Sequence, residues 1–266
     1  MFKNLIRKLD HVIVGSNVPH SEDQDIFDSI YGYEDIKKLL VRCIATKDSI
    51  HVLLAGPPAS SKTLFLLEMI KYFGPKKCYF FDGTSTTGAG LVDYLFAHPH
   101  IQYILIDEID KMKRSDQVVL LNLMETGMLV STKVRKTASI KMTNSVKVFA
   151  TSNSLDRLSK PLKSRFSIFD LPEYTYEQFE DIATKLLGEK YGLPQTTAIK
   201  IANCVWNQLN SKDVRDILKI GKLIKSNDDI QWLIDMHKKY RWSKEGEDIH
   251  YPCACMLFFI HYDDSG

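Results

Sequence analysis

The stretch that begins at Gly56 contains the residue types of a loop that holds phosphate groups. The general pattern of such a loop is a glycine, four residues of any type, a second glycine, a lysine and a serine or threonine. In this chain Gly56 opens the pattern, and Lys62 and Thr63 close it. Backbone N–H groups surround the phosphates in these loops, the lysine neutralises their charge and the hydroxyl binds Mg²⁺. We therefore expect the following residues to contact a nucleotide: Gly56, Pro57, Pro58, Ala59, Ser60, Ser61, Lys62 and Thr63.

Two positions of this loop depart from the pattern. Ser61 stands where the second glycine belongs, and Ala59 stands where many nucleotide-binding loops carry a further glycine. Backbone amides act independently of the side chain, so a small side chain interferes only where the backbone must adopt a positive φ. Taken alone, the loop is compatible with a working nucleotide site and with a relic of one.

A pair of carboxylates follows an apolar run in the segment YILIDEIDK. Asp107 and Glu108 come directly after the four residues 103–106. If that run is a strand beside the phosphate loop, Asp107 can hold Mg²⁺ together with Thr63, and Glu108 can polarise an attacking water. The alternative is a solvated acidic loop, which does not explain why the pair follows an apolar run.

Three further polar residues follow later elements. Asn153 ends the segment ATSN, where its amide can orient a water or contact the γ-phosphate; the alternative is a simple turn. Arg165 follows a short helix and can reach the nucleotide of a neighbouring subunit; the alternative is a surface ion pair. Arg215 begins a helix and can reach back to the phosphates; the alternative is a solvated helix terminus.

The elements that must position these residues alternate along the first part of the chain. Short apolar runs separated by helical stretches indicate a parallel sheet with right-handed crossovers. After Pro172 only helical spacing remains, which indicates a helical lid. We expect strands at 50–55, 78–83, 102–107, 147–153 and 167–171, and lid helices within 176–187, 196–209 and 213–224.

Bulk composition excludes little. With 35 basic and 33 acidic residues, the net charge of +2 neither supports nor excludes a nucleic-acid partner. No apolar run approaches the ~20 residues of a membrane helix, so we expect no membrane association. The five cysteines are odd in number and form no C-x-x-C pair, which favours a reducing compartment. We therefore expect a cytoplasmic protein.

The order of these motifs resembles that of an AAA+ ATPase. In that family Lys62 and Thr63 would form Walker A, Asp107 and Glu108 Walker B, Asn153 sensor 1, Arg165 the arginine finger and Arg215 sensor 2. The segment IYGYEDIKKLL is similar to the part of that family that packs on adenine, which adds Tyr31 and Gly32 to the nucleotide contacts. The resemblance covers about residues 28–225.

The resemblance extends to two classes of AAA+ helicase. The segment LSKPLKSRF and the helical lid look like those of Holliday-junction branch-migration helicases. The segments IDEIDKM and SDQVVLLNLMETG look like minichromosome maintenance helicases. The resemblance implies a P-loop NTPase with a three-layer αβα core, a five-stranded parallel sheet and a small all-α lid. It also implies ATP and Mg²⁺ as cofactors, ATP hydrolysis, a homo-oligomeric ring that is usually a hexamer, and a role on DNA, for example in recombination.

This division predicts four parts of the chain. They are a lead-in at 1–27, the ATPase core at 28–172, the lid at 173–240 and a tail at 241–266. Branch-migration helicases carry a DNA-reading winged helix after the lid, and residues 241–266 are too few for one, so a separate DNA-targeting partner is possible. Within the tail, Cys253 and Cys255 make a weak metal site, and the apolar run 253–260 is a strand, a partner-seeking segment or an abnormal terminus.

The DNA hypothesis depends on a basic segment at 127–147. We expect a hairpin there with strands near 128–133 and 138–143 and with Lys133, Arg135 and Lys136 near its tip. In the helicases that this chain resembles, a hairpin at this place points into the central pore of the ring. The alternative is a basic hairpin that is solvated or packed on a neighbouring subunit.

Two rival functions use the same core. One is a protein-remodelling or assembly ATPase without DNA activity, and the other is a nucleotide-dependent scaffold with little turnover. Remodellers usually place an aromatic, an apolar residue and a glycine between the second and third strands. Residues 83–100 contain no such triplet, which disfavours the remodelling function.

Overall fold

The computed structural model describes residues 26–58, 60–133, 136–142 and 145–240, and the side chains of 130–138 are not described. Ala59, Arg135, the side chains of Lys133 and Lys136, the lead-in to residue 25 and the tail with Cys253 and Cys255 therefore lie outside the described residues. Among the described helices, none combines the length and the apolar character needed to span a bilayer.

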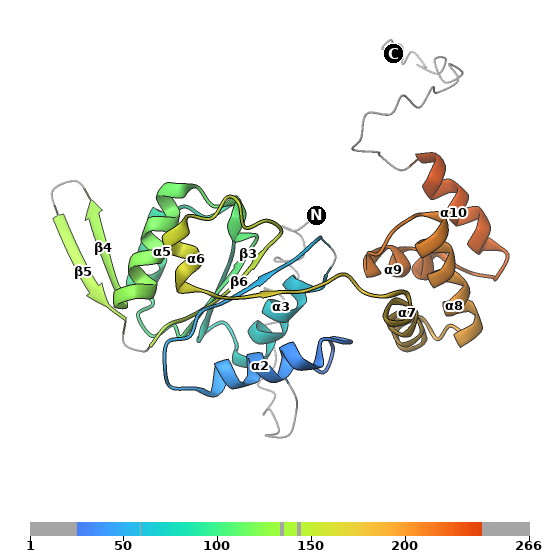
Figure 1. The fold of residues 1–266 in the computed structure, drawn as a ribbon, viewed down its shortest axis with the longest axis horizontal. Coiled ribbons are helices and arrows are strands. Elements are labelled where there is room, and N and C mark those ends of the chain that lie inside the picture. The colour runs from blue at the N-terminus through green and yellow to red at the C-terminus, as the bar shows by residue number, and fades with distance from the viewer. Residues whose placement is uncertain (1–25, 59, 134–135, 143–144, 241–266) are drawn as a thin grey trace, which may run out of the picture.

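A five-stranded parallel sheet forms the centre of the first part of the chain (Figure 1). Its strand order is β2-β3-β6-β1-β7. The strands are β1 (Val52–Ala55), β2 (Cys78–Asp82), β3 (Tyr103–Asp107), β6 (Lys147–Ser152) and β7 (Ser167–Asp170). Each corresponds to one of the strands expected from the sequence. Because all five run in the same direction, their carboxyl ends share one edge, where the phosphate loop and both carboxylates begin.

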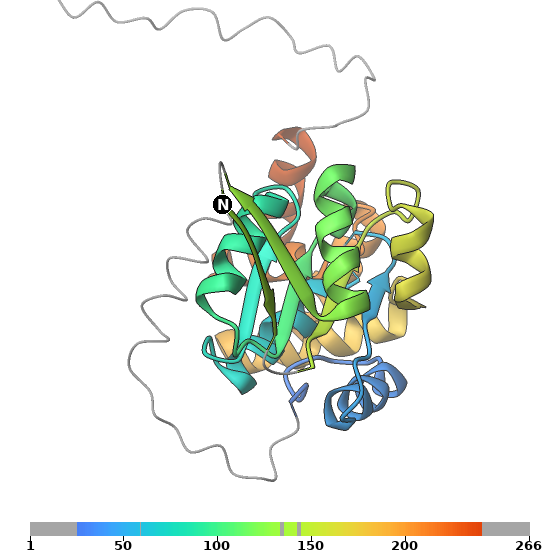
Figure 2. The same ribbon diagram turned by 90° about the vertical axis from the view of Figure 1, so that its left-hand side faces the viewer.

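Helices cover both faces of the sheet and make a three-layer core (Figures 1 and 2). Neighbouring side chains of one strand enter different hydrophobic clusters, as the two faces of a pleated strand require. Leu53 and Ile104 pack with helices α4, α5 and α6, whereas Leu54 and Leu105 pack with helices α2 and α3. These helices are α2 (Glu34–Ala45), α3 (Lys62–Phe73), α4 (Gly88–Ala97), α5 (Arg114–Thr126) and α6 (Lys160–Arg165), and a short 3-10 turn, η1 (Ile109–Lys111), follows β3.

A two-stranded antiparallel hairpin, β4 (Met128–Lys133) and β5 (Lys136–Lys141), extends beyond α5 (Figure 1). The hairpin and its first strand are as predicted, but the predicted second strand at 138–143 is two residues too late. Pairing continues to Lys133 opposite Lys136.

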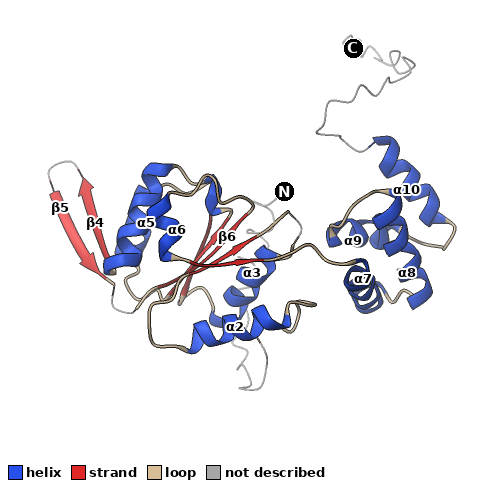
Figure 3. Cartoon of the chain, viewed as in Figure 1, coloured by secondary structure: helices blue, strands red, loops and turns tan. Residues whose placement is uncertain are grey.

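The last described part of the chain, residues 173–240, is helical (Figure 3). Its helices are α7 (Tyr176–Tyr191), α8 (Gln195–Asn203), α9 (Val214–Leu223) and α10 (Asp229–Tyr240). Thr175 begins α7 with a capping box that includes Gln178. The single helix expected at 196–209 is instead α8 followed by a π-helical turn, Cys204–Gln208. These helices share a hydrophobic cluster of their own, which also contains Tyr174 from the segment that enters α7.

Candidate nucleotide-binding site

The phosphate loop connects β1 to the N-terminus of α3, so the N–H groups of the first turn of α3 point toward the loop. Gly56 has φ 142°, and a Cβ there would lie 2.4 Å from the carbonyl oxygen of Leu171. Only glycine fits that position. The opening residue of the pattern is therefore required by the close approach of the segment after β7.

Ser61 adopts the backbone conformation that a glycine would adopt at this position. Its φ is 57° and its ψ is 9°, in the left-handed region, which costs an L-residue about 1–2 kcal/mol. Its hydroxyl forms a 2.7 Å hydrogen bond with the hydroxyl of Tyr174. The loss of the second glycine thus leaves the backbone of the described part of the loop in a glycine-like shape.

Lys62 lies over the loop and is buried. Its ammonium donates to the carbonyl oxygens of Gly56 (2.8 Å) and Pro57 (2.6 Å) and to Ser60 Oγ (2.9 Å). Burial lowers the pKa of Lys62, and nearby carboxylates, Asp107 first among them, oppose that shift. An anionic phosphate would be a stronger acceptor for this ammonium than the neutral oxygens that hold it.

Thr63 and Asp107, which the sequence assigns to the metal, are brought together across the edge of the sheet. Thr63 Oγ1 donates to Asp107 Oδ1 at 2.9 Å and lies 3.1 Å from Oδ2. A hydroxyl and a carboxylate are the hard oxygen ligands that Mg²⁺ prefers, and its usual sites take the remaining ligands from phosphates and waters. This pair fits such a site, although the described residues contain no group of three or more His, Cys, Asp or Glu side chains able to hold a metal.

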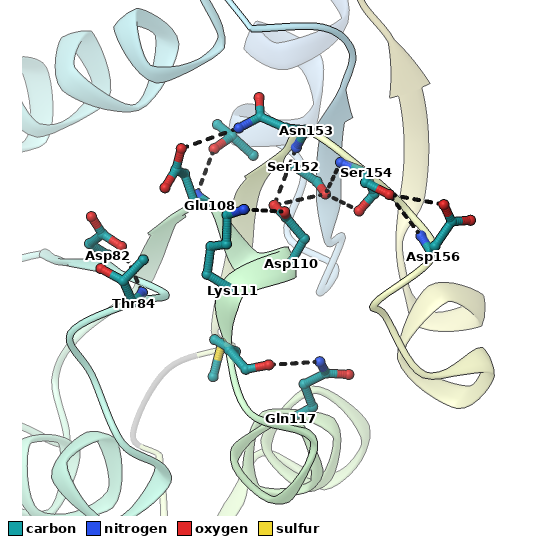
Figure 4. A network of polar contacts seen from close by, with 12 residues as sticks. Asp82, Thr84, Glu108, Asp110, Lys111, Gln117, Ser152, Asn153, Ser154 and Asp156 are labelled. Carbon is teal, nitrogen blue, oxygen red and sulfur yellow. Dashed lines mark hydrogen bonds and ion pairs between the residues drawn. The ribbon is translucent and has the colours of Figure 1, made fainter. Parts of the chain in front are cut away.

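Glu108 stands at the end of β3 with φ 52°, a left-handed conformation that directs its carboxylate toward the end of β6. Its Oε1 accepts a 3.2 Å hydrogen bond from Asn153 Nδ2, so the structure also joins these two predicted residues (Figure 4). Burial raises the pKa of Glu108, and the negative charges of Asp107 and Asp82 add to the effect. A carboxylate with a raised pKa is a better proton acceptor once it is ionised.

Two residues that sequence reasoning did not single out hold this arrangement. Thr151 Oγ1 donates to Asp107 Oδ1 at 2.5 Å and accepts from the Glu108 backbone N–H at 3.0 Å. Asp110 is buried and accepts from Ser152 Oγ and from the Asn153 backbone N–H, both at 3.2 Å (Figure 4). The available signals were the third acid of IDEID and the polar residues that end the run KVFATSN.

The two arginines lie apart from these contacts in the single chain. Arg165 at the end of α6 pairs with Glu125, and both side chains are 43% exposed. Arg215 at the start of α9 pairs with Asp213, with Nε 2.8 Å from Oδ2. Exposed pairs of this kind contribute roughly 0–1 kcal/mol, so each arginine can exchange its carboxylate for a stronger partner.

Tyr31 and Gly32 line a cavity of about 270 Å³ between the segment before α2 and the side of α7. Tyr31 donates its hydroxyl to Glu189 at 3.0 Å, and Lys185 Nζ lies 5.0 Å from the centre of its ring. Gln178, Asp181, Ile182 and Lys185 supply the α7 wall. The cavity thus combines an aromatic ring, an apolar side chain and hydrogen-bonding groups, which suits a planar heterocycle.

Part of this chain matches a known protein family. Residues 52–172 match the family described as "ATPase family associated with various cellular activities (AAA)". The DNA replication licensing factor mcm7 of Schizosaccharomyces pombe is 25% identical over 193 residues, which cover 62% of this chain and 25% of that protein. The Holliday junction branch migration complex subunit RuvB of Prochlorococcus marinus is 28% identical over 167 residues, which cover 59% of this chain and 46% of that protein.

Among solved structures, a variant of Thermotoga maritima RuvB superposes with a TM-score of 0.64 at 19% identity, covering 81% of this chain and 73% of that one. The chain spans less than half of the length of either sequence relative. Residues 52–172 therefore match the AAA family model, and the fold is that of an AAA+ P-loop NTPase: an αβα core with a five-stranded parallel sheet, followed by a small helical lid.

Proposed function

We propose that this chain binds ATP on the loop from Gly56 to Thr63 and hydrolyses it to ADP and phosphate with Mg²⁺. The observation that carries the proposal is the joint presence of two contacts at one sheet edge. Thr63 meets Asp107, and Asn153 meets Glu108. The first pair is suited to a metal ion and the second to a water molecule. Phosphate release by the purified chain, with and without Mg²⁺, tests the proposal.

Each residue then has a separate task. Lys62 turns from the loop carbonyls to the outer phosphates, and the N–H groups at the start of α3 surround the phosphates. Thr63 and Asp107 would hold Mg²⁺, which would neutralise charge on the phosphates. Glu108 accepts a proton from the attacking water, and Asn153 keeps the carboxylate and the water in line.

We place the base of the nucleotide in the cavity beside Tyr31 and Gly32. The segment from Gly32 to Tyr33 joins this cavity to the end of the core, just before the lid, because Tyr33 donates its hydroxyl to the carbonyl oxygen of Pro172 at 2.8 Å. A base held there would contact the core segment and α7 at once. Nucleotide binding would thereby favour one arrangement of core and lid, since a ligand stabilises the state that it binds.

The motor that this site would drive is, in our proposal, a ring that acts on DNA. Two observations support it: the similarity to RuvB and to licensing factors, and the hairpin β4–β5 with its basic sequence between Lys133 and Lys136. Several hairpins gathered around a pore would concentrate a positive charge that the net charge of +2 conceals. Such a surface follows a phosphate backbone without reading bases.

Replacing Lys133, Arg135 and Lys136 with alanine should weaken DNA binding and flatten its salt dependence, while basal ATP hydrolysis stays nearly unchanged. Each lost phosphate contact reduces the magnitude of the negative slope of log K against log salt by about 0.9 on duplex and about 0.7 on single strands. Three lost contacts therefore reduce that magnitude by about 2–3. Fluorescence anisotropy across a salt series measures it on single-stranded, duplex and branched DNA.

A matched control replaces three exposed lid lysines, Lys190, Lys222 and Lys225, with alanine, which changes the net charge equally. This control should keep the wild-type slope. Equal slopes for the hairpin variant and the wild type would remove the hairpin from the DNA contact. If the wild type shows no salt-sensitive DNA binding, the protein-remodelling function becomes the better proposal.

The proposed trans role of Arg165 can be tested only in an assembly of several subunits. If the arginine completes the site of the next subunit in a head-to-tail ring, Arg165→Ala should lower ATP hydrolysis by about 10³-fold or more, because a trans arginine stabilises transition-state charge. Mixing Arg165→Ala subunits with Lys62→Ala subunits should restore activity. In an equal mixture, roughly a quarter of the interfaces join an intact loop to an intact arginine.

Rescue should appear only above the concentration at which the chain assembles with ATP. The Glu125 partner of Arg165 supplies the control, because Glu125→Gln removes the ion pair within one chain and leaves the arginine in place. That variant should hydrolyse ATP at a near-normal rate. Absence of rescue from a mixture shown to be assembled would refute the trans role.

A further inference from the structure

The departure at Ser61 is linked to a second feature, the tyrosine that enters the lid. Tyr174 lies between the end of β7 at Asp170 and the start of α7 at Tyr176, and only 5% of it is exposed. Its ring belongs to the hydrophobic cluster of the lid helices. The 2.7 Å bond between its hydroxyl and Ser61 Oγ therefore ties the phosphate loop to the lid.

Ser61 is the N-cap residue of α3, yet its side chain does not cap that helix. A serine at this position ordinarily accepts a hydrogen bond from an N–H group of the first helical turn. A phosphate on this loop would bind those same N–H groups. The Ser61 hydroxyl is bonded to Tyr174 instead, so the serine side chain makes no bond to those N–H groups.

Tyr174 is itself held in place from the core. Its ring centre lies 5.1 Å from that of Tyr33, whose ring lies 6.2 Å from that of Phe65, a fully buried residue of α3. The contacts from Ser61 through Tyr174 and Tyr33 thus return to the helix that the loop begins. A residue fixed on both sides can define where the serine hydroxyl points.

We propose that Tyr174 is a positioning residue for nucleotide binding, and that this chain needs it because Ser61 replaces the loop glycine. The inference rests on the proposed function for the site itself. A loop with glycine at this position has no hydroxyl to direct and no left-handed strain to offset. Removing the Tyr174 hydroxyl should therefore weaken nucleotide binding when residue 61 is serine and have little effect when residue 61 is glycine.

A double-mutant cycle measures that dependence. The affinity for ATP with Mg²⁺ is compared among the wild type, Tyr174→Phe, Ser61→Gly and the double variant by calorimetry. Tyr174→Phe should weaken binding about threefold to tenfold, the size of one neutral hydrogen bond. In the Ser61→Gly background the same change should alter affinity by less than about twofold, since the two positions no longer interact.

Two controls distinguish this role from a nonspecific loss of structure. Tyr176→Phe removes a lid hydroxyl that bonds to Asn203 rather than to the loop, and it should leave affinity unchanged. Hydrogen exchange at the loop amides of the nucleotide-free chain should rise for Tyr174→Phe in the Ser61 background alone. Because that readout needs no ligand, it tests the coupling between Tyr174 and Ser61 even if the chain fails to bind ATP. Failure to bind ATP would count against the proposed function only.

Equal losses in both backgrounds would overturn the inference, because Tyr174 would then act through its ring and not through Ser61. Unchanged affinity together with unchanged loop exchange would also overturn it. A loss confined to the Ser61 background supports it.

Discussion

Glu108→Gln should bind ATP about as tightly as the wild type but release phosphate about 10²–10⁴-fold more slowly, the usual contribution of a general base. The amide keeps an oxygen that can accept from Asn153 Nδ2, which lies 3.2 Å from the carboxylate in the wild type. It loses the ability to take a proton from water. Steady-state phosphate release and equilibrium binding of labelled ATP separate the two effects.

Glu68→Gln is the matched control, because Glu68 lies on the same helix as the loop lysine and pairs with Lys71. Its phosphate release should equal that of the wild type.

The wild type should also lose activity as the pH falls through the pKa of Glu108, because the protonated acid cannot accept a proton. Since burial and neighbouring carboxylates raise that pKa, the loss should begin at a higher pH than an exposed glutamate would produce. A Glu108→Gln variant with normal turnover would remove the residue from catalysis.

Lys62→Ala should weaken ATP binding by roughly 10–150-fold, the equivalent of about 1.5–3 kcal/mol for hydrogen bonds to a charged group. The lysine is the buried cation of the loop, and its three acceptors all belong to the loop. Without it, the outer phosphates would face Asp107 and Glu108 with no cationic side chain between them. Isothermal calorimetry with ATP measures the loss.

Lys71→Ala is the control for this substitution, since it removes an exposed cation from the same helix. Its affinity should match that of the wild type. The thermal unfolding midpoint of Lys62→Ala checks that the carbonyl oxygens of Gly56 and Pro57 find water in place of the ammonium. A folded Lys62→Ala variant with wild-type affinity would show that the phosphates bind elsewhere.

The parts of the site that follow strand order could be predicted from the sequence. Lys62, Thr63, Asp107 and Asn153 each follow an apolar run directly or through one turn, and parallel strands bring such positions to one edge. That rule needs only the identity and order of the strands. It therefore predicted that these residues share one edge, and the structure adds the Thr63–Asp107 and Glu108–Asn153 contacts.

The supporting contacts could not be predicted in the same way. Thr151 bonds to both Asp107 and Glu108 only because β3 and β6 are neighbours with a particular register. The loop approaches Leu171 at Gly56 and forms a hydrogen bond with Tyr174 at Ser61, and both partners are more than a hundred positions away in the sequence. A pattern of residue types contains no information on such long-range contacts.

The ends of elements were also difficult to predict. The second hairpin strand begins at Lys136 because the β4–β5 pairing continues to Lys133 opposite Lys136. The helix that starts at Gln195 changes to a π-helical turn at Cys204 without any proline or glycine to announce it. Apolar spacing identifies which face of an element is buried, but it does not determine the residue at which the element ends, because that depends on local geometry.

The most direct test of the proposed activity is phosphate release from millimolar ATP by the purified wild-type chain, with Mg²⁺ and with EDTA, beside the Glu108→Gln variant. Parallel reactions contain single-stranded, duplex or branched DNA. We predict release that requires Mg²⁺, falls by about 10²–10⁴-fold in Glu108→Gln and rises with at least one form of DNA. A wild-type chain that neither binds ATP nor releases phosphate under any of these conditions would contradict the assignment of a working nucleotide site.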